Sequence, residues 1–308
     1  MSQPTNTTIV LCPGQGAQHA GMGRSWATAE SAAAAVFKQA DAILGTDLST
    51  ACFNGPDERI HRTDTAQPAI YTCSIACLKA LESRGAYAPT TLAAVAGLSL
   101  GEFTALHLAG VFSFEEGLKL VAQRGRFMQE AAEASNSGMV ALIGADESQA
   151  NALCDAARGN DILVAANFNC PGQIVISGSK AACERSLIEA GKIGIRATAI
   201  PVAGAFHSPL MQPAADRMAD ALARVTFHPP RVPVPSNVTG KPHGNETNEI
   251  KRLLVEQITS PVRWEKNVRW LVENVKGRYI EPAPGKVLTG LMRRIEKAVK
   301  VENFAEAA

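Results

Sequence analysis

Strong net charge and long apolar runs are both missing from this sequence. Thirty Lys and Arg residues against 29 Asp and Glu give a formal net charge of +1, so we expect no nucleic-acid partner. No uninterrupted apolar run reaches the roughly 20 residues that cross a bilayer. Residues 1–8 lack the basic start and the apolar stretch of a signal peptide. These absences predict a cytoplasmic protein that does not enter a membrane.

The motifs of metal and nucleotide sites are missing as well. The seven cysteines are scattered, and Cys73 and Cys77 stand four residues apart, which is neither a zinc nor a redox spacing. The sequence contains no HExxH, no paired CxxC and no Gly-x4-Gly-Lys-Ser/Thr motif. The run that begins at Gly14 has His19 where a dinucleotide fingerprint requires its third glycine. We therefore expect reduced cysteines, no metal and no cofactor.

Of the 308 residues, 46% are hydrophobic and 19% are charged, which is the composition of a globular protein. One motif is conspicuous, Gly97-Leu98-Ser99-Leu100-Gly101. The motif lies between an apolar run that predicts a buried strand, 92–98, and a segment that predicts a helix, 102–109. Gly-x-Ser-x-Gly at a strand-to-helix turn is typical of a nucleophile elbow, in which a strained backbone lifts the serine hydroxyl to the edge of a sheet. The alternative is an ordinary serine in a glycine-flanked turn.

The remaining pattern predicts an α/β fold with an inserted subdomain. Residues 136–200 contain candidate strands and helices in the order βαββαβ, which is typical of a ferredoxin-like arrangement. Residues 1–135 and 201–308 would then form one larger catalytic domain. Outside the insert we expect a strand at 7–12, helices at 29–44, 67–84, 115–134, 209–224 and 246–257, a proline-rich strand region at 229–238, further helices to the end, and a frayed acidic tail beyond Val301.

His207 is the histidine whose position best suits a catalytic base. It follows a predicted strand and precedes a predicted helix, where a sheet presents side chains to its site. An ordinary loop histidine is equally compatible with that position. His107, one turn into the helix after the elbow, is instead expected to pack inside the fold.

Arg124 is a charged residue on an otherwise apolar helix face. Val121, Phe127 and Met128 surround it at helical spacing, which places it on the core-facing side. Such an arginine usually snorkels to the surface or pairs with a structural carboxylate. Beside a serine nucleophile it can instead clamp a substrate carboxylate through two parallel hydrogen bonds.

Seven segments, in chain order, resemble the malonyl-CoA:acyl-carrier-protein transacylase family, the malonyltransferases of fatty-acid synthesis and relatives of polyketide acyltransferase domains. The segments are Pro13–Gln18, Gly97–Glu102, Gln123–Gln129, Asn167–Gln173, Gly204–Met211, Gln257–Trp264 and Pro284–Gly290. The resemblance implies an α/β-hydrolase-like large domain with a ferredoxin-like insert. It also implies a monomer that needs no metal or redox cofactor.

The resemblance assigns a role to each candidate residue of the site. Ser99 becomes the nucleophile and His207 its base, oriented by the backbone carbonyl at Gln257. Arg124 becomes the partner of the malonyl carboxylate. Elbow sites take one oxyanion donor from the residue after the serine and another from a separate loop, and the resemblance places these amides at Leu100 and Gln15. Met128 and Phe206 are expected to line the substrate pocket, with Phe206 narrowing it against a 2-methyl branch.

The implied reaction is transfer of a malonyl group from malonyl-CoA to the phosphopantetheine thiol of acyl carrier protein, through a malonyl-serine. One alternative is an acyl-ester or thioester hydrolase with the same Ser/His pair. Such a hydrolase places an Asp or Glu between serine and histidine in chain order, and here the acids between residues 138 and 202 fall in the insert. A non-catalytic carrier-docking module is a third reading, which the presence of Ser99, His207 and Arg124 disfavours.

Two departures and one surface feature complete the comparison. Leu98 stands where the family commonly has histidine, and Ala283 stands where it often has glycine in a Glu-x-Gly-Pro stretch. Because carrier proteins are acidic, a basic rim is expected to guide docking. The candidates, any of which can equally be solvated surface charge, are Lys192, Arg196, Arg293 and Arg294.

Overall fold

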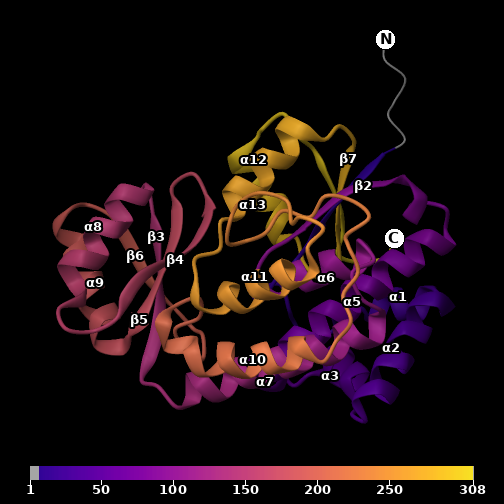
Figure 1. Ribbon diagram of the computed structural model, residues 1–308, viewed down its shortest axis with the longest axis horizontal. Coiled ribbons are helices and arrows are strands. Elements are labelled where there is room, and N and C mark those ends of the chain that lie inside the picture. The colour runs from indigo at the N-terminus through magenta and orange to yellow at the C-terminus, as the bar shows by residue number, and fades with distance from the viewer. Residues whose placement is uncertain (1–6, 308) are drawn as a thin grey trace.

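Two four-stranded sheets organise the chain (Figure 1). The structure is a computed structural model that describes residues 7–307, so the signal-peptide expectation for residues 1–6 lies outside the described residues. The first sheet is parallel, with the strand order β2-β1-β7-β8. Its strands are β1 (Thr8–Cys12), β2 (Leu92–Gly97), β7 (Arg278–Pro282) and β8 (Val301–Phe304).

Strand β1 supplies side chains to hydrophobic cores on both faces of the first sheet. Ile9 and Leu11 enter one core, whereas Val10 and Cys12 enter the other. The helices that pack on the Val10 side include α2 (Ser31–Leu44), α5 (Thr63–Ser83), α6 (Gly101–Leu108) and α7 (Phe114–Glu133). On the other side lie α12 (Trp264–Asn274) and α13 (Val287–Ile295). Because both faces are covered, β1 can be apolar at every position from Ile9 to Cys12.

The second sheet is antiparallel and has its own core. Its elements are β3 (Ser137–Ile143), α8 (Glu147–Arg158), β4 (Leu163–Cys170), β5 (Gln173–Ser179), α9 (Lys180–Lys192) and β6 (Arg196–Ile200). The strands lie in the order β4-β5-β3-β6, and α8 and α9 pack on one face, at the left of Figure 1. The six elements therefore follow one another in the order expected for residues 136–200.

The β4 end of the second sheet contacts the segment before α12 and helix α13, which pack on the first sheet. Phe168 N donates to Val262 O (2.9 Å) and Val262 N donates to Ala166 O (2.8 Å), just before α12. Arg294 of α13 reaches the β4–β5 turn, where its guanidinium donates to Pro171 O (3.0 Å) and Gln173 Oε1 (2.9 Å). These contacts hold the edge of the second sheet beside the carboxyl ends of β1 and β2.

The remaining helices pack around the first sheet. They are α1 (Arg24–Ala29), α3 (Leu48–Asn54), α4 (Asp57–His61), α10 (Gln212–Ala223), α11 (Thr247–Thr259) and the 3-10 turns Pro89–Thr91 and Pro209–Met211. Within residues 7–307, no helix is both long and apolar enough to cross a bilayer.

Several expected elements are wrong. The region 229–238 forms no strand beyond a single bridge between Pro235 and Pro242, because proline has no N–H to donate to a ladder. The acidic tail is not frayed: it forms β8 beside β7, and Trp26 Nε1 donates to Phe304 O (3.0 Å). The expectation of only helices near the end missed β7 and β8. The helix expected at 29–44 is present as α2, whereas α1, which ends just before it at Ala29, was not expected.

Candidate active site

Ser99 stands at a sharp turn between β2 and α6. Its φ of 52° lies in the left-handed region, which is strained for a residue with a side chain. The flanking glycines make the turn possible because a Cβ at Gly97 would collide with the backbone of Gly101, and a Cβ at Gly101 would collide with Cys12 O. Asn237 Oδ1 accepts the Ser99 N–H (2.6 Å) and so holds the turn from behind. The local geometry is that of a nucleophile elbow.

His207 faces the serine hydroxyl. Its Nε2 lies 2.8 Å from Ser99 Oγ, and its Nδ1 lies 2.7 Å from the backbone oxygen of Gln257. Because a carbonyl only accepts, Nδ1 carries the proton and Nε2 is free to accept one from Ser99. In the described part of the chain no carboxylate lies within ion-pair distance of His207.

Burial, together with the nearby charge of Arg124, lowers the pKa of His207 to about 4, against the opposing effect of the Gln257 carbonyl. The imidazole is therefore neutral near pH 7. A neutral imidazole can take the proton of Ser99.

Arg124 is buried beside Ser99 and has only neutral hydrogen-bond partners. Its Nη1 donates to Gln67 Oε1 (2.7 Å), and its Nη2 donates to Gln257 Oε1 (2.8 Å) and Ser99 Oγ (3.1 Å). Its Nε has no partner among residues 7–307. Burial lowers its pKa to about 10, against the opposing charge of Glu102, so the guanidinium is still protonated at pH 7. A buried cation with a free donor is suited to an incoming anion.

Four buried polar residues around the elbow and Arg124 were not anticipated from the sequence: Glu102, Asn237, His243 and Gln67. Glu102 is fully buried, and its carboxylate accepts from His243 Nε2 (2.7 Å), Asn237 N (3.1 Å) and Gln257 Nε2 (2.6 Å). Gln67 lies on α5, which is apolar at most of its buried positions. An amide inside such a helix was the one available signal, since buried polar groups need partners.

The loop after β1 lies against the elbow. A Cβ at Gly14 would collide with the backbone oxygen of Leu98, so the two segments meet at a spacing only glycine allows. Gln18 Oε1 accepts Gly16 N (2.6 Å), which fixes the loop. The backbone amides of Gln15 and Leu100 donate to no acceptor in the part of the chain that the structure describes. Both amides remain available for a substrate oxygen.

A cavity of about 450 Å³ opens at Ser99 and His207 between the two sheets. Gln15, Met128 and Phe206 line it, and Leu98 forms part of its wall. Gln67 also lines it. The second sheet contributes the polar side chains Asn167, Asn169 and Gln173 and the apolar side chains Met139, Val175 and Ile200. The cavity is therefore shared between the two halves of the fold.

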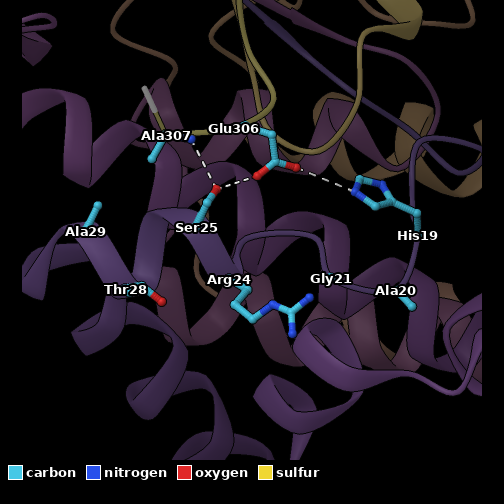
Figure 2. Close-up of a pocket in the computed structure, with 9 residues that line it drawn as sticks. All are labelled: His19, Ala20, Gly21, Arg24, Ser25, Thr28, Ala29, Glu306 and Ala307. Atoms are coloured by element: carbon cyan, nitrogen blue, oxygen red, sulfur yellow. Dashed lines mark hydrogen bonds and ion pairs between the residues drawn. The ribbon is translucent and has the colours of Figure 1, made fainter.

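A second hollow, of about 600 Å³, lies outside this site. Figure 2 shows Glu306 between Ser25, with which it is hydrogen-bonded, and His19, whose Nε2 is 3.9 Å away. None of its lining residues lines the cavity at Ser99. This hollow lies between the C-terminal segment and the start of α1. No group of three metal-ligating side chains occurs here or elsewhere in residues 7–307.

The basic candidates of the rim have different surroundings. Arg294 is engaged with the β4–β5 turn, and Lys192 pairs with Glu189 on its own helix (2.7 Å). Arg293 and Arg196 are exposed. His107, as expected, is packed: its Nδ1 lies 3.1 Å from Phe112 O.

Comparisons with known proteins agree with this geometry. Residues 9–308 match the family model "Acyl transferase domain". The chain is 40% identical over 284 residues to the malonyl CoA-acyl carrier protein transacylase of Escherichia coli O157:H7, covering 92% of this chain and 91% of that protein. The Bacillus subtilis protein of the same name is 40% identical over 292 residues, covering 94% of this chain and 90% of that protein.

Solved structures of such proteins have the same fold. The malonyl CoA-acyl carrier protein transacylase from Coxiella burnetii superposes with a TM-score of 0.93 at 36% identity, covering 99% of this chain and 96% of that one. A malonyl-transacylase solved in complex with its type II PKS acyl-carrier protein superposes with a TM-score of 0.92 at 35% identity, covering 98% and 96%. The chain is an acyltransferase that belongs to the malonyl CoA-acyl carrier protein transacylase family.

Proposed function

We propose that this enzyme transfers a malonyl group from malonyl-CoA to the phosphopantetheine thiol of acyl carrier protein, supplying fatty-acid synthesis. The observation that carries the proposal is the buried Arg124, which has no carboxylate partner among residues 7–307 and whose Nη2 lies 3.1 Å from Ser99 Oγ. A cation at that position is suited to an acyl group that ends in a carboxylate. The relatives named above support the same substrate class.

The first half-reaction forms an ester on Ser99. His207 Nε2 takes the hydroxyl proton while Oγ attacks the thioester carbonyl carbon. The charge that develops on the carbonyl oxygen is received by the amides of Leu100 and Gln15, and one such donor is worth about 3–4 kcal/mol. When the carbon–sulfur bond breaks, His207 returns its proton to the departing thiolate.

The second half-reaction reverses these steps with a new thiol. The carrier's phosphopantetheine thiol gives its proton to His207, and its sulfur attacks the malonyl ester. The carbon–oxygen bond to Ser99 breaks, and the proton goes from His207 to Oγ. Between the two steps Arg124 holds the malonyl carboxylate, while Met128 and Phe206 enclose the acyl carbons. The cycle is ping-pong and uses no other reactant.

Each of the two sheets forms the centre of one proposed domain. We propose an α/β-hydrolase-like domain, residues 1–135 and 201–308, into which a ferredoxin-like subdomain, residues 136–200, is inserted. The support is the strand order β4-β5-β3-β6 with α8 and α9 on one face, together with a separate core. We also propose a monomer in the cytoplasm, where the seven free cysteines would stay reduced.

Labelling of Ser99 tests the proposed function. Malonyl-CoA should add one malonyl group to the wild-type protein, as measured by intact mass, and none to Ser99→Ala. Adding a phosphopantetheine-bearing carrier protein should then remove the group faster than water does. A protein that takes no label from malonyl-CoA would contradict the proposal, and one that only hydrolyses the label would be a thioesterase.

A further inference from the structure

The side chain of Gln257 stands between two buried charges. Its Oε1 accepts from Arg124 Nη2 (2.8 Å), and its Nε2 donates to Glu102 Oε2 (2.6 Å) and to Ser99 O (3.0 Å). The orientation of the amide is set by chemistry, because a guanidinium can only donate and a carboxylate can only accept. The role is separate from that of the Gln257 backbone oxygen, which holds His207.

Glu102 is the one carboxylate linked to Arg124 through this amide, and it does not touch the arginine. Its oxygens are occupied by His243 Nε2 (2.7 Å), Asn237 N (3.1 Å) and Gln257 Nε2. Its charge still favours the protonated form of Arg124, whose pKa burial lowers. The arginine thus keeps its charge without a direct ion pair, and its Nε stays unpartnered within residues 7–307.

We propose that the Gln257 side chain determines acyl-group specificity, by acting as a neutral spacer that prevents an internal ion pair to Arg124. A direct carboxylate partner would compete with the substrate's carboxylate for the same donors, whereas the amide leaves the full positive charge for the substrate. The spacer thereby selects acyl groups that end in a carboxylate over neutral ones. This inference rests on the proposed function.

The sharpest test exchanges two neighbouring side chains, so that the carboxylate stands at residue 257 and the amide at residue 102. The double variant Glu102→Gln/Gln257→Glu keeps the composition and total charge but puts the anion directly on Arg124. Single-turnover loading of Ser99 by malonyl-CoA and by acetyl-CoA is measured by intact mass. We expect the malonyl-to-acetyl loading ratio to fall by about 10²-fold, the equivalent of one or two charge-assisted hydrogen bonds.

The matched control is Gln257→Met, which has similar length and no charge. It removes the amide without supplying an anion, so it should slow loading by both acyl groups and keep a ratio at least about tenfold above that of the double variant. Circular dichroism and thermal unfolding establish that each variant is folded. Gln257→Glu alone is measured in parallel; because two adjacent buried carboxyl groups share one proton, it should lower the ratio in the same direction but by less than the double variant does.

The outcomes separate the inference from the function on which it rests. A wild-type ratio that survives an internal carboxylate at position 257 would overturn the spacer, even with malonyl loading intact. Equal losses for both acyl groups in all variants would also overturn it, because they would indicate a purely structural role. Wild-type protein that takes no malonyl label would instead contradict the proposed function.

Discussion

His207 and Arg124 are close neighbours with opposite requirements. In the proposed mechanism the histidine acts as a base only when it is neutral, whereas the arginine binds a carboxylate only when it is charged. Burial disfavours the charged form of both, yet the ordinary pKa of arginine is so high that it stays protonated while the histidine does not. One desolvated environment therefore sets both protonation states correctly.

Removing the guanidinium should change which acyl group is used. Two hydrogen bonds to a carboxylate are worth roughly 1.5–3 kcal/mol each, so Arg124→Ala should lose about 10²- to 10⁴-fold in malonyl transfer. Loading by acetyl-CoA should be equal to wild type or better, since a neutral acyl group does not need the cation. Both rates are measured on folded protein by mass spectrometry of Ser99. If both fall in proportion to folded protein, Arg124 is a structural residue.

The same variant should also shift the pH dependence of acylation. Because the charge of Arg124 lowers the pKa of His207, its removal should move the acid limb of acetyl loading to higher pH than the wild-type limb near pH 4. Single-turnover rates between pH 4 and 8 measure the limb. A limb that stays in place would show that burial alone sets the pKa.

The lowered pKa of His207 should also make the folded protein less stable at acid pH. Between about pH 6.5 and pH 4 the unfolded chain binds a proton at this histidine and the folded chain does not. Above that window the histidine is neutral in both states, and the folded protein keeps its full stability. As the pH falls through the window, protonation of the unfolded chain lowers the free energy of unfolding. Urea denaturation of wild type and His207→Gln at pH 7 and pH 5 measures this: the wild type should lose more stability on acidification, and an equal loss in the two proteins would contradict it.

The site residues that could be predicted from the sequence are those whose local context is unusual for their residue type. Ser99 lies in a motif with a required backbone shape, and Arg124 was singled out because a cation on an apolar face needs an explanation. Glu102 and Asn237 could not be found in the same way. Glu102 looks like an ordinary acid in the first turn of a helix, and Asn237 joins the site only because the chain returns there more than a hundred residues later.

At the scale of elements, the N-terminal end of α13 is held by one buried carboxylate. Glu281 on β7 accepts from Leu288 N (2.8 Å), Thr289 N (2.8 Å) and Thr289 Oγ1 (2.5 Å). Burial raises its pKa, and these hydrogen bonds oppose the rise. The carboxylate satisfies amides that the helix itself cannot pair.

Glu281→Gln should therefore destabilise the protein. The amide can accept with only one oxygen, so one buried donor loses its partner, and we expect a loss of about 2 kcal/mol in the free energy of unfolding. Glu302→Gln on the adjacent strand β8 is the control, because this residue is exposed and its change should stay within about 0.5 kcal/mol. Chemical denaturation compares the two. Equal effects would show that the α13 contact is unimportant.

The elements that escaped prediction share a physical reason. Strands β7 and β8 are five and four residues long, and neither shows the alternation that reveals a half-buried strand. Their conformation comes from pairing with β1 and with each other, which are contacts distant in sequence. By contrast, β1 and β2 were recognisable as short apolar runs, and α7 was recognisable because its own residues carry the helical period.

At the scale of the whole molecule, the cavity at Ser99 lies between two sheets that contribute different parts of it. The first sheet and its helices hold the reacting groups, and the second sheet supplies one wall. Arg293 on α13 is exposed on the helix whose Leu291 lines that cavity. An acidic partner that delivers a long thiol arm would meet this charge near the entrance.

Arg293→Glu should accordingly weaken use of the carrier protein and leave loading from malonyl-CoA near normal. The exposed position limits the effect to about twofold to fivefold in the KM for the carrier, and less at high salt. Arg294 is unsuitable for this test because it also holds the β4–β5 turn. Lys79→Glu, on α5 and outside the cavity lining, is the control. Carrier kinetics at low salt equal to those of this control would discard the docking role.

The burial of every cysteine has a consequence for chemical selectivity. All seven are free and buried, and burial raises the pKa of each thiol, so none offers the thiolate that reacts. An enzyme that passes acyl groups from one external thiol to another would otherwise risk self-acylation. The enzyme's own thiols should not react, so a thiol-specific dye added to the native protein with malonyl-CoA and no carrier protein should report only the coenzyme released when Ser99 is loaded.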